Sequence, residues 1–191
     1  MINDLKTLKD EISKRIDSSL VPRDEEGRAI IEMNVRDDAD FLSPYSANET
    51  ATISSDVAEF LENSAMAYHP KERLTLKISS DCIDEREKTV YEKAIKNFFM
   101  LHSIESTRDL KRNAAYSVVM FIVGLIGFAL MVLCESLELG AIAIECVDIF
   151  AWVFLWESVD LFFIERNVLK IKLLRNLALS DIKFVYDDKK K

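Results

Sequence analysis

Four carboxylates lie inside a long apolar stretch of this sequence. Glu145, Asp148, Glu157 and Asp160 all fall within 139–164, a segment without Lys or Arg. An ionised carboxylate at mid-bilayer costs roughly 2.5–3.5 kcal/mol, so four of them cannot all face lipid. They must face water, each other or a partner helix. Rings of Asp and Glu attract cations and exclude anions, so cation passage is the chemistry that these residues could serve.

The spacing of the four acids is typical of one face of a helix. At about 100° per residue, with Glu145 at zero, Asp148 falls at about 300°, Asp160 at about 60° and Glu157 at about 120°. The same half of the helix holds Trp152, Trp156 and Phe163. The other half is apolar and is expected to face lipid; it consists of Ala143, Ile144, Val147, Ala151, Phe154, Leu155, Leu161 and Phe162.

Two interpretations of this acidic face are open. In the first, several copies associate and their acidic faces line a polar path. The inner acid pair is then Glu157 and Asp160, the outer pair is Glu145 and Asp148, and the constriction is Trp152 and Trp156. In the second, the helix lies shallow in the membrane or is shielded by a partner. The acid pairs are about 18 Å apart along a helix, less than a hydrocarbon core of about 30 Å, which favours the first interpretation.

The preceding segment is a stronger candidate for a transmembrane helix. Ala114 to Cys134 is a run of 21 residues without a charge. At 1.5 Å per residue it spans about 31 Å, the thickness of a bilayer hydrocarbon core. A long polar stretch precedes it, so it is not a signal peptide. We therefore predict a two-helix transmembrane hairpin over 108–166, with helices at 114–134 and 139–164.

Basic residues flank this predicted hairpin on one side. The connecting stretch holds Glu135 and Glu138 but no Lys or Arg. The positive-inside rule then places both termini in the cytoplasm and the turn outside, which predicts an integral protein of the plasma membrane. The basic residues that set this topology are Arg108, Lys111, Arg112, Arg166, Lys170, Lys172 and Arg175.

Residues 1–107 are expected to form an α+β cytosolic domain. It begins with an amphipathic helix over 3–20 and contains strands over 29–35 and 74–78. A helix over 54–68 separates the strands, and another begins at Asp84. The latter is expected to run towards the membrane, and a break near 103–107 is an open alternative.

Residues 167–191 are expected to continue as a cytosolic helix. A strand over 181–186 follows it and could return to the sheet of the first domain. The predicted fold is therefore mainly α, with a small sheet and several helices fused to a transmembrane hairpin.

Several functional classes are excluded by composition and by missing motifs. The chain has 25 Lys and Arg against 33 Asp and Glu, which argues against a nucleic-acid binder. It lacks the glycine-rich phosphate-binding motifs and shows no set of nucleophile, base and orienting residue. We therefore expect that the protein is not an enzyme and that it has no catalytic residue, no cofactor and no metal site. Whether Cys134 and Cys146, which flank the outer turn, form a disulfide is left open.

The leading hypothesis is a homo-oligomeric integral membrane protein whose acid-faced second helix lines a cation-permeable pore. The cytosolic domain would control this pore through an unidentified ligand or protein. The alternative is a non-conducting, membrane-anchored adaptor or scaffold that binds a cytosolic partner. The expected partners are thus the lipid bilayer, further copies of the chain and a cytosolic factor, but no nucleic acid.

Overall fold

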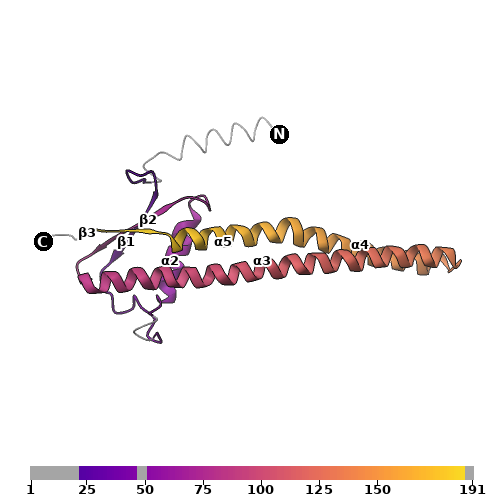
Figure 1. Ribbon diagram of the computed structural model, residues 1–191, viewed down its shortest axis with the longest axis horizontal. Helices are drawn as coiled ribbons and strands as arrows, with labels where there is room; N and C mark the ends of the chain where they lie inside the picture. The colour runs from indigo at the N-terminus through magenta and orange to yellow at the C-terminus, as the bar shows by residue number, and fades with distance from the viewer. Residues whose placement is uncertain (1–21, 47–50, 188–191) are drawn as a thin grey trace. The chain divides into compact units, whose positions relative to one another are not determined.

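The computed structural model describes residues 22–46 and 51–187, so the helix expected over 3–20 lies outside the described residues. The described chain is mainly helical and contains a three-stranded parallel sheet, which confirms the predicted small sheet and helical character (Figure 1). It divides into two compact units. The sheet unit combines the residues up to Leu101 with those from Leu174 onward, and the hairpin unit comprises His102–Leu173.

The sheet unit is organised around three strands in the order β1-β2-β3. They are β1 (Ala29–Val35), β2 (Leu74–Ser80) and β3 (Lys183–Asp187), and both neighbouring pairs are parallel. These are the segments expected at 29–35, 74–78 and 181–186. Helices separate consecutive strands along the chain, and such crossovers are what parallel pairing requires. The last strand therefore joins the sheet only after the whole hairpin unit has intervened in the sequence.

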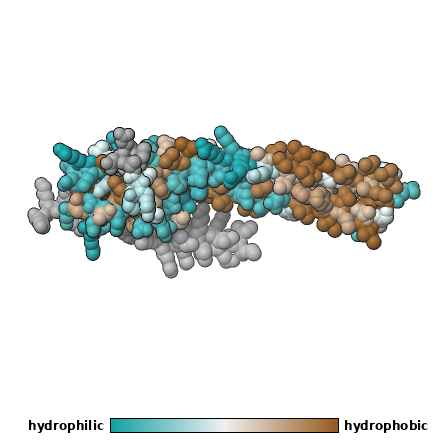
Figure 2. Space-filling view, turned by 90° about the horizontal axis from the view of Figure 1, so that it is seen from below, coloured by the Kyte–Doolittle hydropathy of each residue, from teal (hydrophilic) through white to brown (hydrophobic). Residues whose placement is uncertain are grey.

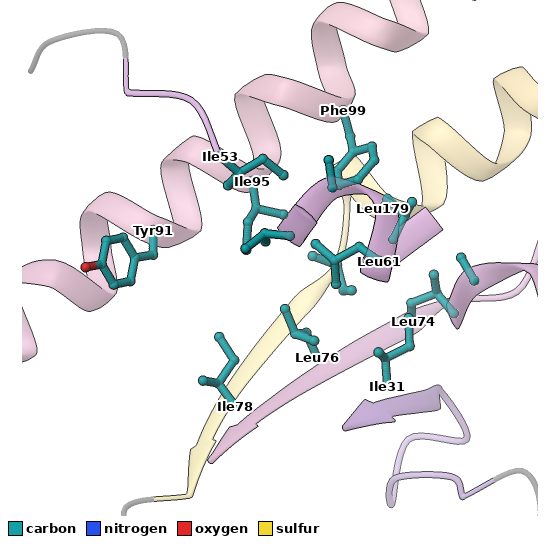
Figure 3. Close-up of a cluster of buried hydrophobic side chains, with 14 of the residues drawn as sticks. Ile31, Ile53, Leu61, Leu74, Leu76, Ile78, Tyr91, Ile95, Phe99 and Leu179 are labelled. Carbon is teal, nitrogen blue, oxygen red and sulfur yellow. The ribbon is translucent and has the colours of Figure 1, made fainter. Parts of the chain in front are cut away.

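The core of the sheet unit forms between one sheet face and three helices. These are α2 (Ser55–Met66), the start of α3 (Glu85–Ser136) and the end of α5 (Arg166–Ser180). Figure 3 shows Leu61, Ile95, Phe99 and Leu179 converging from these helices, with Leu76 of the central strand below them. All five side chains are at most 1% exposed. Alternate residues of a strand share one face, which explains why the core residues Ala29, Ile31 and Val35 of β1, and Leu74, Leu76 and Ile78 of β2, are an even number of positions apart.

The other face of the sheet is polar and carries a shallow hollow of about 400 Å³. Its lining includes Glu32, Asn34, Lys77, Ser79 and Asp187. Lys77 Nζ lies 2.9 Å from Asp187 Oδ2, and this hydrogen bond raises the pKa of Lys77. The hollow lies at the carboxyl ends of the strands, where open parallel sheets commonly receive ligands.

Helix α3 runs without a break through 52 residues, so the alternative of a break near 103–107 is wrong. Thr107 Oγ1 donates to the Ser103 carbonyl at 2.8 Å, which satisfies this hydroxyl inside the helix. The boundary between the two units falls within α3, after Leu101. Among the described residues, α3 is the helix that is long and apolar enough to cross a membrane, by length and composition.

A tight turn joins α3 to α4 (Ala141–Asp160), which continues as a π-helix, η2 (Leu161–Glu165). Glu138 has φ of 53°, in the left-handed region. The Leu139 N–H donates to the Cys134 carbonyl at 3.1 Å, and the Glu138 N–H donates to the Glu135 carbonyl at 3.1 Å. This pair of hydrogen bonds is a Schellman motif, which ends α3 although its left-handed position is usually glycine.

Candidate functional site

Helices α3 and α4 pack closely through small residues. A Cβ atom at Gly127 would lie 2.8 Å from Ala151 Cβ, and one at Gly124 would lie 2.7 Å from Leu155 Cδ2. Because real Cβ atoms essentially never approach so closely, a side chain at Gly127 would push the Ala151 backbone away, whereas one at Gly124 would displace the flexible Leu155 side chain. Close backbone approach through small residues is a common mode of helix packing in membranes.

Two polar rungs continue the same contact line towards residue 113. Ser117 Oγ donates to the Ser158 carbonyl at 3.0 Å, and Ser158 Oγ donates to the Ser117 carbonyl at 2.9 Å. Further along, Asn113 Nδ2 donates to Glu165 Oε2 at 2.9 Å. Sequence reasoning missed these contacts. The signal that could have found them is the spacing of residues 113, 117, 124 and 127, which fits the heptad repeat of a helix–helix seam.

This packing places apolar residues of α4, rather than its acids, against the glycines of α3. The expectation that Ala151, Leu155 and Leu161 face lipid is wrong, because Ala151 and Leu155 contact the glycines of α3 and Leu161 is buried. Outside this contact line, Trp152 is 51% exposed and Trp156 is 67% exposed.

The four acids differ in exposure. Glu145 and Glu157 are exposed, whereas Asp148 and Asp160 are half-buried. The structure therefore exposes Glu145, Glu157 and Trp156, whereas the Trp152 ring, although half exposed, packs against Phe128 of α3 with ring centroids 5.7 Å apart. We call the acids and both tryptophans together the acidic face of α4; it comprises Glu145, Asp148, Trp152, Trp156, Glu157 and Asp160.

The π-helix η2 limits how far the predicted helical geometry holds. A π-helix has a wider turn than an α-helix, so residues after Asp160 rotate away from their positions at 100° per residue. The prediction that Phe163 shares a face with the acids therefore does not hold, because it assumed a uniform 100° per residue. Its neighbour Phe162 lies beside Arg166, whose guanidinium carbon is 5.4 Å from the ring centroid.

The pairing of the two helices fixes the level of each acid along the hairpin. Gly127 lies beside Ala151, and Asn113 lies beside Glu165. The uncharged run 114–134 therefore lies alongside roughly 144–164 of the returning helices, since both rise 1.5 Å per residue. One acid pair is near the turn, the other is near the Asn113–Glu165 rung, and the two tryptophans lie between them.

The predicted basic flanks divide between the two units. The hairpin unit contains six of them, all exposed: Arg108, Lys111, Arg112, Arg166, Lys170 and Lys172. The seventh, Arg175, is half-buried and belongs to the sheet unit.

The remaining reactive groups form no recognisable centre. Cys134 and Cys146 are free thiols in the structure, as is Cys82. Within 22–46 and 51–187, no group of three or more His, Cys, Asp or Glu side chains could hold a metal ion. A comparison with protein-family models, curated proteins and solved structures finds no match for this chain.

Proposed function

We propose that the chain is a homo-oligomeric membrane protein in which α3 and the α4–η2 segment both cross the bilayer. In this proposal the acidic faces of α4 from several copies surround a cation-permeable path. The observation that carries the proposal is the placement of the acidic face: Glu145, Glu157 and Trp156 are exposed, and the α4 residues that meet α3 along the glycine and serine contacts are Ala151, Leu155 and Ser158 rather than the acids.

The surfaces of the two helices suit different surroundings. The outward residues of α3 are large and apolar, among them Val118, Phe121, Ile122, Leu125 and Ile126, and each is about half exposed. They can contact lipid without cost. The carboxylates of α4 cannot, because charged groups in a membrane segment need water or a partner. Copies arranged with α3 outside and α4 around a central axis satisfy both demands.

The order of residues along α4 suits the passage of cations. Glu157 and Asp160 form an inner acidic ring, and Glu145 with Asp148 forms an outer one. Such rings concentrate cations and repel anions. Trp152 and Trp156 narrow the path between the rings. The sheet unit controls the opening in this proposal, because α3 contributes residues to both units and the polar hollow offers a place for a ligand.

Ion flux from liposomes that contain the purified full-length protein tests this proposal. We expect cation flux from the parent, and a lower flux or weaker preference for K⁺ over Cl⁻ in Glu157→Gln/Asp160→Asn. The matched control, Glu59→Gln/Asp181→Asn, removes the same charge from exposed positions of the sheet unit and is expected to behave as the parent.

Three outcomes contradict the pore. Unchanged selectivity in Glu157→Gln/Asp160→Asn would show that these acids do not line the path. Absence of flux in all three proteins would favour the alternative function, a non-conducting adaptor anchored by the hairpin and recruiting a partner through the sheet unit. A persistent monomer in detergent would also contradict a path formed by several copies.

A further inference from the structure

We propose that the hairpin unit carries a binding surface for anionic phospholipid headgroups. This surface, the basic belt, consists of Arg108, Lys111, Arg112, Arg166, Lys170 and Lys172. The inference rests on the proposed insertion of the hairpin into a membrane, but it does not depend on ion conduction.

The polar rung between Asn113 and Glu165 brings the two halves of the basic belt to one level. Arg112 precedes Asn113 on α3, and Arg166 follows Glu165 on the returning chain. The other cations follow within two helical turns, so the whole belt lies within about 10 Å of this rung along the helices. Headgroup layers of a bilayer have a similar depth, since they extend a core of about 30 Å to about 40–45 Å.

The carboxylates at this level already have partners. Asn113 donates to Glu165, and Arg112 Nη2 lies 3.0 Å from Asp109 Oδ1. Across the described residues, no carboxylate lies within ion-pair distance of Arg108, Lys111, Lys170 or Lys172; Glu105, on the next turn of α3, pairs with none of them. These exposed cations therefore remain available to an external anion.

The surroundings of the basic belt favour a lipid phosphate over a soluble anion. Figure 2 shows the hydrophobic surface of the hairpin giving way to hydrophilic residues, the place where a bilayer would present its headgroups. The opposite end of the hairpin has Glu135, Glu138 and Glu145 but no Lys or Arg. Anionic lipid is thus attracted to one end of the hairpin, in accord with the attraction of basic clusters beside membrane helices to anionic leaflets.

Thermal unfolding of the detergent-solubilised full chain tests this inference. Phosphatidylglycerol is expected to raise the unfolding temperature more than an equal amount of phosphatidylcholine does. In Arg108→Gln/Lys111→Gln/Lys170→Gln this difference is expected to fall to half or less. The control Arg86→Gln/Lys71→Gln/Lys93→Gln loses the same charge from exposed sites of the sheet unit and is expected to keep it.

Three results would overturn the lipid surface. The first is an equal effect of the two lipids on the parent, and the second is an equal loss in the control variant. The third is an equal effect of soluble glycerol phosphate, which would assign the basic belt to free phosphate. Extraction of cell membranes with alkaline carbonate separates this failure from that of membrane insertion: a released protein contradicts both proposals, whereas a retained protein without lipid preference contradicts only this one.

Discussion

At the scale of single residues, two tyrosines link the stability of the sheet unit to pH. Tyr91 stacks on Phe41 with centroids 4.3 Å apart, and its hydroxyl donates to Asp38 Oδ2 at 3.0 Å. Burial and then the hydrogen bond to Asp38 raise the pKa of Tyr91. The Tyr186 hydroxyl donates to the Lys88 carbonyl at 3.2 Å. Burial, together with nearby glutamates, raises the pKa of Tyr186 as well.

These raised pKa values predict alkaline destabilisation. Above the ordinary tyrosine pKa of 10.0, the unfolded chain releases both phenolic protons while the folded chain retains them. The unfolded state then binds fewer protons, so the free energy of unfolding falls as pH rises beyond about 10. Thermal unfolding between pH 8 and pH 11 is expected to show this fall, and Tyr91→Phe/Tyr186→Phe to flatten it. Equal pH slopes in parent and variant would refute the assignment.

At the scale of elements, the α3–α4 contact predicts a graded response to added methyl groups. At Gly127 the new Cβ meets the Ala151 backbone Cα at 3.0 Å, whereas at Gly124 the two nearest atoms belong to the Leu155 side chain, which can rotate. Gly127→Ala is therefore expected to destabilise the hairpin by about 1–3 kcal/mol. Gly124→Ala should cost less, because alanine also improves helix propensity by up to about 1 kcal/mol.

The chain supplies its own probe and control for this measurement. Both of its tryptophans, Trp152 and Trp156, lie on α4, and the Trp152 ring centroid is 5.7 Å from that of Phe128 on α3. Tryptophan fluorescence during denaturant unfolding therefore reports on this contact. A Cβ at Gly140 meets no atom within 4 Å, so Gly140→Ala is expected to unfold as the parent does. Equal effects at all three glycines would contradict the packing.

The strands and most helices could be predicted from local pattern, but the partner of each helix face could not. Alternating apolar residues identified β2, and the spacing of Tyr91, Ile95 and Phe98 identified the start of α3. The apolar half of α4 was assigned to lipid because hydropathy does not distinguish a lipid contact from a helix contact. The discriminating residues, Gly124 and Gly127, lie on the other helix, and their heptad spacing with residues 113 and 117 is the sequence signal that marks the contact.

The π-helix also could not be predicted from a helical wheel. A wheel assumes a uniform turn, and nothing in the residues 161–165 marks the extra residue of a wider one. The candidate acids were less affected, since all four precede this segment. Their common face could therefore be derived from spacing, whereas the reason for its exposure depends on the contact of Ala151 with α3.

At the scale of the whole molecule, the proposed association of copies can be tested with a native thiol. Cys146 is exposed and follows Glu145 of the acidic face. If copies meet through this face, mild oxidation of the protein in liposomes is expected to give a disulfide-linked dimer. Because Cys82 is also exposed, the experiment uses a Cys82→Ser background.

Two further variants decide the result. Cys146→Ser is expected to abolish the cross-link, and Cys134→Ser is expected to retain it, since Cys134 is half-buried. A dimer that persists without Cys146 would place the contact between copies elsewhere. Failure to cross-link at any oxidant strength would count against association through the acidic face.

The position of β3 in the chain has a consequence for biosynthesis. A ribosome makes β1 and β2 first, then the apolar helices, and only afterwards Leu179, Ile182 and β3, which complete the core and the third strand. The sheet unit thus cannot reach its final form while the apolar helices are still being translated. A nascent chain that stalls there leaves one edge of β2 unpaired and exposed to quality-control proteases. Completion of this fold therefore reports that translation has passed the entire hairpin.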